Sequence, residues 1–222
     1  MAVDFDLVVQ QLIPGYASLA RLSVALLAAS PLASQPGADV LIAGCGTGAE
    51  LLEAAAQRPD WQVTAIDPSA TMLSVARQRL EASGSPLAVS WQQSTVEELA
   101  AEARFAGALS VLVLQSLADD GTKLAFLTSL ARSLKPGGQL VLVDLMRPSH
   151  SPLQSQIDAA WLGFQRASGL KEPASDLDAM TRGLHPIGDA RLTALVNAAG
   201  FLDPAPVFQA LDVQGFLLQR AA

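Results

Sequence analysis

Short apolar runs alternate with amphipathic segments along most of the chain. The apolar runs predict buried strands at 40–43, 63–66, 87–91, 108–114 and 140–144. Segments with helical periodicity lie between them, at 48–57, 69–82 and 121–134. Ser69 is expected to cap the second helix, and Lys135-Pro136-Gly137-Gly138 to stop the third. Strands that alternate with helices in this way favour a parallel sheet covered on both faces.

Two further segments flank this alternating core. Residues 1–35 predict an N-terminal helical arm, and residues 148–186 predict a helical insertion of two helices. A last core helix at 191–199 and strands near 207–210 and 216–219 complete the sheet. We expect one domain over 1–222, made of the arm, a core at 36–147, the lid insertion and a closing part at 187–222. The expected fold is α/β and Rossmann-like, with a mostly parallel seven-stranded sheet, helices on both faces and a helical lid.

Composition and charge narrow the range of partners. The 222 residues are 50% hydrophobic and 16% charged, which is enough for a buried core without disulfides or metal. Cys45 is the single cysteine, and the two histidines, His150 and His185, lie far apart, so no metal site is expected. The net charge of −7 would repel a polyanion, and no run of Lys and Arg offsets it. We therefore expect a small-molecule substrate and no nucleic acid.

A membrane location is not expected. The apolar stretch at 19–32 is interrupted by Arg21 and ended by Pro31, so it is too short to span a bilayer. Asp4 and Asp6 occupy the N-terminal region where a signal peptide would carry positive charge. The cytosol is the predicted location, and whether the chain forms a homodimer stays open.

A glycine-rich turn gives the strongest chemical signal. Gly44-Cys45-Gly46-Thr47-Gly48 follows the first strand, and glycines there let the backbone turn sharply and approach a ligand. Asp67 ends the second strand, where its carboxylate can accept both hydroxyls of a ribose. Ala49 could complete a G-x-G-x-x-A pattern, so a dinucleotide site is the rival interpretation.

The segments downstream of this turn distinguish the two. Ser69, Met72-Leu73, Leu134-Lys135-Pro136-Gly137-Gly138 and the following strand to Asp144 resemble the class I S-adenosylmethionine (SAM) dependent methyltransferases, over about residues 40–144. The resemblance implies that the glycine turn holds the methionine part of SAM and that Asp67 holds the ribose. The cofactor contacts that it implies are Gly44, Cys45, Gly46, Gly48, Asp67, Pro68, Met72, Thr95, Val96 and Leu114.

The segment after the third strand departs from that family. Gln93-Ser94-Thr95-Val96 stands where the family often has Gly-Asp-Ala, with the Asp on the adenine amine. The resemblance therefore implies adenine contacts from Thr95 and the backbone N–H of Val96. Thr95 also has the spacing to cap a helix through Glu98, and the two roles can coexist.

The two ends of the chain have a closer resemblance. Ile13-Pro14-Gly15-Tyr16, Leu114-Gln115-Ser116-Leu117, the run from Gly163 to Leu170 and Phe208-Gln209 resemble carboxy-SAM synthases and their relatives, which remodel SAM at its sulfonium methyl. In those enzymes an Arg recognises the carboxymethyl group. Leu195 stands in its place here, and Arg191 lies a helical turn away, so carboxy-SAM production is not expected.

A second departure concerns the amino group of SAM. The family usually has Asp or Glu two residues before the first glycine, and Ile42 stands there instead. Backbone carbonyls and water could hold the amine. Alternatively, a drier site without a carboxylate would favour a neutral amine. That amine could attack its own Cγ and give azetidine-2-carboxylate and methylthioadenosine. The main hypothesis is methyl transfer from SAM to a small molecule, and this SAM cyclase is the alternative.

The catalytic candidates are Tyr16, Gln115 and Asp144. Tyr16 could cover the sulfonium through cation–π attraction or pack in the core. Gln115 follows the fourth strand, where relatives keep substrate or SAM contacts, and Asp144 ends the fifth strand, facing the site or capping the next turn. Methyl transfer asks for alignment more than for acid–base groups. Trp161 and Phe164 are expected in the core of the lid, and Lys123 at the surface.

Overall fold

A single seven-stranded sheet organises the chain in the computed structural model, which describes residues 5–100, 102–147, 151–170 and 181–222. The strands are β1 (Asp39–Ala43), β2 (Gln62–Ile66), β3 (Ala88–Gln92), β4 (Phe105–Val111), β5 (Leu134–Leu145), β6 (Ala205–Ala210) and β7 (Val213–Gln219). Their order across the sheet is β3-β2-β1-β4-β5-β7-β6. Only β7 runs antiparallel to its neighbours, β5 and β6. The predicted α/β fold with a mostly parallel sheet is confirmed.

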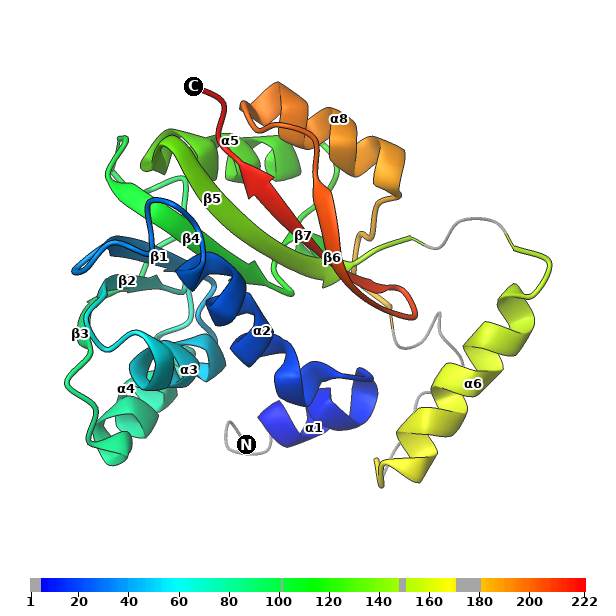
Figure 1. The fold of residues 1–222 in the computed structure, drawn as a ribbon. Coiled ribbons are helices and arrows are strands. Elements are labelled where there is room, and N and C mark those ends of the chain that lie inside the picture. The colour runs from blue at the N-terminus through cyan, green and yellow to red at the C-terminus, as the bar shows by residue number, and fades with distance from the viewer. Residues whose placement is uncertain (1–4, 101, 148–150, 171–180) are drawn as a thin grey trace.

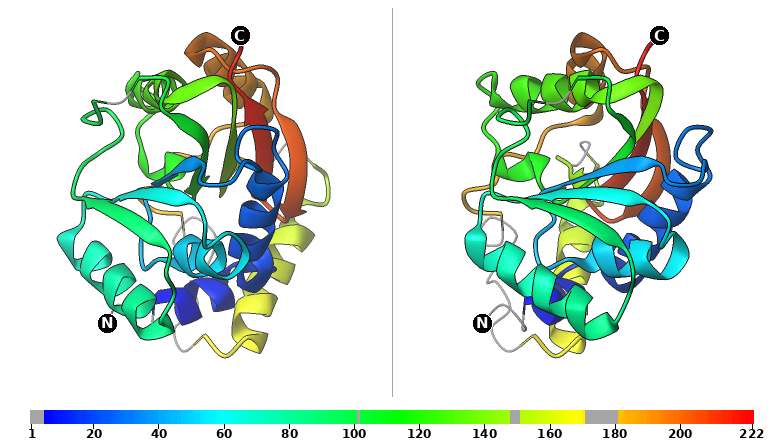
Figure 2. Two further views of the ribbon diagram at one scale, coloured as in Figure 1. Left: turned by 60° about the vertical axis from the view of Figure 1, so that its left-hand side comes forward. Right: turned by 90° about the vertical axis from the view of Figure 1, so that its left-hand side faces the viewer.

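Helices cover both faces of this sheet (Figures 1 and 2). The described helices are α1 (Phe5–Leu12), α2 (Tyr16–Ala28), α3 (Ala49–Gln57), α4 (Ala70–Ser83), α5 (Thr122–Ser133), α6 (Gln154–Ala167), α8 (Asp189–Ala199) and the short 3-10 helix η1 (Leu114–Ser116). Successive β1 side chains point to opposite faces, as the pleat requires. Leu41 and Ala43 pack with α5 and α8, whereas Val40 and Ile42 pack with α2, α3 and α4. A strand buried on both sides in this way has no polar face, and this explains its continuous apolar run.

The ends of two strands differ from the prediction. β4 was expected at 108–114 but spans Phe105–Val111, because Leu112 turns the chain with a positive φ of 57°. β5 starts at Leu134, so the segment expected to stop the helix belongs to the strand. Leu134 pairs with Phe105 across a register shift, and Gly137 and Gly138 form backbone hydrogen bonds with Arg220. These partners are remote in sequence, and they draw a local turn signal into the sheet.

The lid insertion stands off from the sheet. Figure 1 shows α6 apart from the main body, beside α1. The Trp161 indole N–H donates to the Leu12 carbonyl at 2.7 Å, and Trp161 is 1% exposed. Trp161 is thus buried against the N-terminal arm, and Phe164 is half-buried on the same helix. The insertion at 148–186 was predicted to contain two helices, and its residues 148–150 and 171–180 lie outside the described residues.

The two N-terminal helices are the part of the described chain whose length and apolarity come nearest to those of a membrane span. Within the described residues no single helix is both long and apolar enough to cross a bilayer. The Asp6–Leu12 and Tyr16–Ala28 helices meet the criterion only when taken together, as a pair bent by 100°.

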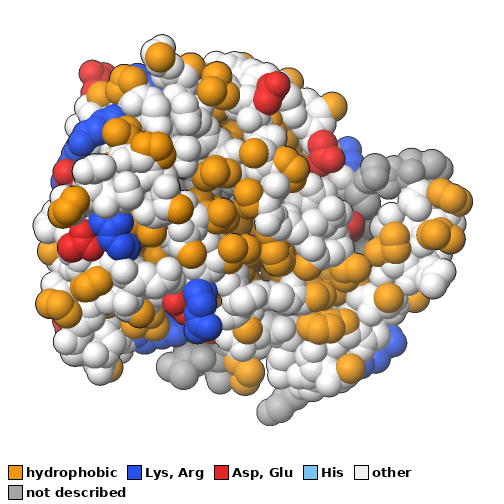
Figure 3. Space-filling view, viewed as in Figure 1, with side chains coloured by type: hydrophobic (Ala, Val, Ile, Leu, Met, Phe, Trp, Pro, Cys, Tyr) orange, Lys and Arg blue, Asp and Glu red, His pale blue; other side chains and the backbone are white. Residues whose placement is uncertain are grey.

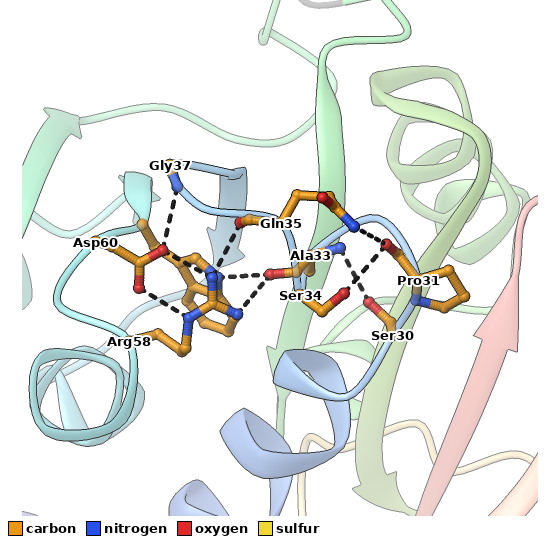
Figure 4. A network of polar contacts seen from close by, with 9 residues as sticks. Ser30, Pro31, Ala33, Ser34, Gln35, Gly37, Arg58 and Asp60 are labelled. Carbon is orange, nitrogen blue, oxygen red and sulfur yellow. Dashed lines mark hydrogen bonds and ion pairs between the residues drawn. The ribbon is translucent and has the colours of Figure 1, made fainter.

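The loop between α2 and β1 is held by one arginine (Figure 4). The Arg58 guanidinium donates to the carbonyl of Ala33 at 2.8 Å and to that of Gln35 at 3.0 Å. It also forms a two-point ion pair with Asp60, which in turn accepts from the Gly37 N–H. This network attaches the N-terminal arm to the start of the sheet.

Arg58→Met is expected to lower the free energy of unfolding by about 1.5–3 kcal/mol, because it removes charge-assisted hydrogen bonds to loop carbonyls. Urea denaturation measures the change. Arg104→Met is the matched control, because Arg104 also pairs with an aspartate, Asp39, but both side chains are more than a third exposed. It should change stability by less than about 1 kcal/mol. Equal effects of the two substitutions would remove the special role of Arg58.

Candidate active site

A cavity of about 340 Å³ opens where β1, β2 and β4 end. Its wall consists of the glycine loop at 44–47, the first residues of α3, the segment from Asp67 to Met72, the end of β4 at 111–113, and Tyr16. Ligand sites of doubly wound sheets lie at the carboxyl ends of the strands, beside the crossover point. The sequence-predicted residues Tyr16, Gly44, Cys45, Gly46, Asp67, Pro68 and Met72 all line this cavity.

The glycine loop has the shape that the predicted cofactor needs. Gly44 has φ 71°, and a Cβ there would lie 2.4 Å from the Val113 side chain, so any other residue would clash. Gly46 also has a positive φ, lines the cavity, and has no atom within 4 Å of the position that a Cβ would take. Gly48 has a different role: a Cβ would approach Ala76 to 3.0 Å, so this glycine lets α3 start against α4. It is absent from the cavity wall, and its predicted cofactor contact stays a prediction.

Asp67 joins the two loops of the cavity. Its carboxylate accepts from the N–H of Gly46 at 2.9 Å and from the N–H of Ser69 at 2.8 Å. A carboxylate has about four acceptor positions, so two remain for a ligand. Ser69 caps α4 as predicted, because its hydroxyl accepts from the Met72 N–H at 3.3 Å. The geometry therefore fits the predicted role of Asp67 on a ribose.

A second carboxylate in the cavity was missed from the sequence. Glu50 lies in the first turn of α3, lines the cavity and is 7% exposed. Burial raises its pKa to about 7, a hydrogen bond from its own backbone N–H opposes this rise, and the charges of Asp6 and Arg79 have smaller, opposing effects. Within the described residues it forms no salt bridge. In sequence Glu50 looks like an ordinary acid at a helix N-terminus, so its burial gave no signal.

Tyr16 and Cys45 line the same cavity as Glu50 and are close enough to be affected by its charge. Burial and the nearby charges of Glu50 and Asp6 raise the pKa of Tyr16, so the phenol keeps its proton at neutral pH. Burial likewise raises the pKa of the Cys45 thiol to about 12, with added contributions from Asp67 and Glu50. Neither group can therefore act as an anion here, and the cation–π role predicted for Tyr16 stays a prediction.

The N-terminal arm is attached to the glycine loop. Asp6 of α1 accepts a hydrogen bond from the Thr47 hydroxyl at 2.5 Å and forms an ion pair with Arg79 at 2.5 Å. Arg79 also donates to the Thr47 carbonyl at 2.8 Å. These contacts bring α1, the glycine loop and α4 together at the mouth of the cavity.

A second, mostly apolar cavity of about 230 Å³ lies beneath the arm. Its wall includes Val9, Leu12, Ile13, Leu112, Gln115, Leu145, Trp161, Leu184 and Val213. Leu112 lines both cavities, so the two cavities lie next to each other at this residue. On the face shown in Figure 3, hydrophobic side chains gather near the centre and continue towards α6.

Gln115 contributes the polar group of this second wall. Its side-chain oxygen accepts from the Leu145 N–H at 3.0 Å, which fixes the amide and leaves its two N–H groups as donors. Its backbone carbonyl accepts from the His185 N–H at 2.7 Å, so the lid segment is attached at the same residue. This position agrees with a substrate contact by Gln115.

Asp144 lies behind the cavity wall instead of facing a substrate. Its carboxylate is 1% exposed and accepts from the backbone N–H groups of Leu114, Gln115 and Leu145 at 2.7, 2.8 and 3.0 Å. Burial raises its pKa to about 7, against these donors and the nearby charge of Lys123. Lys123 is fully buried and donates to the Leu114 carbonyl, so its expected surface position is wrong. The geometry gives Asp144 and Lys123 the structural role of holding the turn after β4.

Other predicted contacts lie outside both cavity walls. Leu114 is buried beneath the first cavity, with its N–H on Asp144. Thr95 is exposed and its N–H bonds to Glu98 at 2.9 Å, but the segment forms a turn instead of the helix that Thr95 was expected to cap. Val96 is 3% exposed and packs in the core. The adenine contacts of Thr95 and Val96 therefore stay predictions.

Leu195, which stands where carboxy-SAM synthases have the Arg that recognises the carboxymethyl group, has apolar surroundings. Leu195 is 3% exposed and packs in the core between α8 and the sheet. Arg191 forms a two-point ion pair with Asp119, at 2.8 and 3.0 Å, outside the cavity. Neither residue provides a cation to the wall of the first cavity.

The sequence of this chain is similar to those of known methyltransferases and of a SAM-modifying enzyme. Residues 40–138 match the family model described as methyltransferase domain. The chain is 27% identical over 173 residues to a carboxy-S-adenosyl-L-methionine synthase of Aeromonas salmonicida, covering 76% of this chain and 67% of that one. It is 40% identical over 114 residues to a ubiquinone biosynthesis O-methyltransferase of Xanthomonas campestris, covering 50% and 45%. The chain thus spans about two thirds of the length of the synthase and less than half of that of the O-methyltransferase.

A solved structure extends the likeness to the whole sheet. The 1,6-didemethyltoxoflavin-N1-methyltransferase of Burkholderia thailandensis, with its substrate and S-adenosylhomocysteine bound, superposes with a TM-score of 0.63 at 21% identity. The match covers 92% of this chain and 80% of that one. The glycine loop and Asp67 lie inside the matched domain, at the carboxyl ends of β1 and β2. Residues 40–138 therefore form a methyltransferase domain, and the fold around them is that of the class I SAM-dependent methyltransferases, whose cofactor is S-adenosylmethionine.

Proposed function

We propose that this enzyme transfers the methyl group of SAM to a small, largely apolar acceptor. The observation that carries the proposal is Leu112, which lines both cavities and so makes the apolar cavity a direct neighbour of the predicted cofactor site. The second cavity, of about 230 Å³, is below the usual range of about 300–1,000 Å³ for ligand pockets, which favours a small acceptor.

The residues of the second cavity support transfer by positioning. When bound, SAM supplies an electrophilic methyl group on a sulfonium. Among the described wall residues, Gln115 has the one polar side chain, and its N–H donors can orient an acceptor oxygen or nitrogen. The other wall side chains, from Val9, Leu12, Ile13 and Trp161 among others, exclude water from the reacting atoms. Alignment in such a dry site can supply much of the rate acceleration of a displacement.

Leu112 takes part in this positioning through its backbone. It is one of three described non-glycine residues with a positive φ, and its N–H donates to the Val143 carbonyl at 2.7 Å. A strained conformation of this kind persists where the surroundings determine it, often at functional sites. It fixes the position of Leu112 at the wall that both cavities share.

The SAM cyclase hypothesis has lost one of its supports. It requires a site without a carboxylate near the amine, whereas Glu50 lies in the cavity wall. A carboxylate favours the protonated ammonium, which is not a nucleophile. Methyl transfer is therefore the function that the geometry supports best.

Incubation of the purified protein with SAM tests both functions. With small apolar phenols, enols and amines as acceptors, we expect S-adenosylhomocysteine and a product 14 mass units heavier, which mass spectrometry detects. With SAM alone, we expect SAM to stay unchanged. Methylthioadenosine formed together with azetidine-2-carboxylate in that second reaction would establish the cyclase instead.

A further inference from the structure

The resemblance to class I methyltransferases implies an Asp or Glu two residues before Gly44, where it would bind the amino group of SAM. Ile42 occupies that position, is 2% exposed and packs in the core with α2, α3 and α4. It does not line the first cavity. A polar substitute for the missing acid must therefore come from another element of the wall.

Glu50 is placed to be that substitute. Its carboxylate belongs to the wall of the first cavity, beside Tyr16 and the glycine loop, on a different element from the ribose acid Asp67. It is more than nine-tenths buried and has no salt bridge among the residues that the structure describes. A buried carboxylate without a cation is costly unless a ligand supplies one.

The charged groups around Glu50 leave it free for a ligand. Arg79 of α4 is the nearby cation, and its guanidinium is already bonded to Asp6 of α1 and to the Thr47 carbonyl. Tyr16 of α2 and Cys45 of the glycine loop keep their protons at neutral pH, because burial raises both pKa values. Among the described residues, Glu50 thus has a hydrogen bond from its own backbone N–H but no cation in an ion pair.

We infer that Glu50 binds the ammonium of SAM and replaces the strand carboxylate that Ile42 lacks. The inference rests on the proposed use of SAM and adds to it the residue that recognises the amino-acid end of the cofactor. Asp67 and Glu50 together then contribute the two negative groups that face a ligand carrying a sulfonium and an ammonium.

A pH dependence of SAM affinity follows from this role. Burial raises the pKa of free Glu50 to about 7, and a bound ammonium favours the ionised carboxylate and lowers that pKa again. Affinity therefore falls as the pH drops below about 7, because Glu50 becomes protonated. Calorimetry in buffers of different ionisation enthalpy should detect release of roughly half a proton per SAM at pH 7.

Glu50→Gln tests the contact, because it keeps the size of the side chain and removes the charge. We expect the affinities for SAM and for S-adenosylhomocysteine to fall by about 10- to 100-fold, since both carry the ammonium. Affinity for methylthioadenosine, which lacks the amino-acid part, should change by less than about twofold. The proton release and the pH dependence between 6 and 8 should disappear.

Glu53→Gln is the matched control on the same helix. Glu53 faces Arg21 and Gln57 instead of the cavity, so all three affinities should stay as in the wild type. The melting temperature of ligand-free Glu50→Gln should equal or exceed that of the wild type, because the variant loses a buried charge that lacks a cation. Because the pKa of Glu50 is higher in the folded protein than in the unfolded chain, its ionisation lowers the stability of the ligand-free protein progressively as the pH rises from about 4 to 7.

Each other outcome has a distinct meaning. Weaker binding of SAM with unchanged binding of S-adenosylhomocysteine would place Glu50 at the sulfonium and overturn the inference. Equal losses of affinity for all three ligands would overturn the inference, because Glu50 would then have a structural role. Unchanged affinities for all three would also overturn it, because Glu50 would then have no role in binding. A wild-type protein that binds none of the three would instead overturn the proposed function, and the inference with it.

Discussion

Asp144→Ala is expected to lower the free energy of unfolding by about 3–5 kcal/mol, the largest effect on stability among the site residues. The substitution leaves two backbone N–H groups, those of Leu114 and Gln115, without their acceptor in the interior, whereas the Leu145 N–H keeps the side-chain oxygen of Gln115. It also removes the nearest countercharge of the fully buried Lys123. For a chain of this size the melting temperature should fall by roughly 6–20 °C, which calorimetry measures.

Two companion variants separate a structural from a catalytic role for Asp144. Asp144→Asn keeps an acceptor oxygen and the shape, so its stability should lie between those of the wild type and the alanine variant. Asp119→Ala removes an exposed partner of Arg191 and should change stability by less than about 1 kcal/mol. Normal stability of Asp144→Ala combined with lost turnover would return Asp144 to the catalytic residues.

Asp67→Ala is expected to have the second large effect, a loss of about 1.5–3 kcal/mol in SAM binding, or roughly 10- to 150-fold in Kd. The variant removes the acceptor for the ribose hydroxyls and the partner of the Gly46 N–H, which shapes the glycine loop. Isothermal titration of SAM and of methylthioadenosine measures the loss. Both ligands should weaken alike, because both carry the ribose.

The contrast with Glu50 makes this prediction specific. Glu50→Gln discriminates between ligands with and without the ammonium, whereas Asp67→Ala does not. Asp39→Ala is a suitable control, because Asp39 lies at the opposite end of β1 and pairs with exposed Arg104. Unchanged SAM affinity in Asp67→Ala would contradict the ribose assignment.

Local patterns predicted those parts of the fold that depend on neighbours in sequence. The apolar runs of β1 and β2 and the N-cap at Ser69 are properties of a few consecutive residues, and the structure confirms them. The predicted start of β5 was wrong because the first residues of this strand pair with Phe105 and Arg220, which are remote in sequence. Propensity and turn residues contain no information about such partners.

The residues of the candidate site also fall into those that the sequence predicts and those that depend on packing. Gly44, Gly46 and Asp67 sit at strand ends, so the order of the strands already places them together. The environment of Glu50 depends on α1 and α2, which place Asp6 and Tyr16 beside it. Lys123 shows the same dependence: its ammonium reaches the Leu114 carbonyl beneath the turn after β4, although nothing near it in sequence indicates burial. Burial of a charged residue is a property of packing, and the sequence pattern alone does not reveal it.

The division of the two cavities between segments has a consequence for the evolution of this enzyme. The sheet and its loops form most of the first cavity, whereas Val9, Leu12 and Ile13, within a stretch of five positions in the N-terminal arm, form part of the second. Mutations in that short stretch can reshape the acceptor space while the glycine loop and Asp67 stay untouched. A lineage of such enzymes can therefore acquire new acceptors through its first turns of helix and still inherit the same cofactor site.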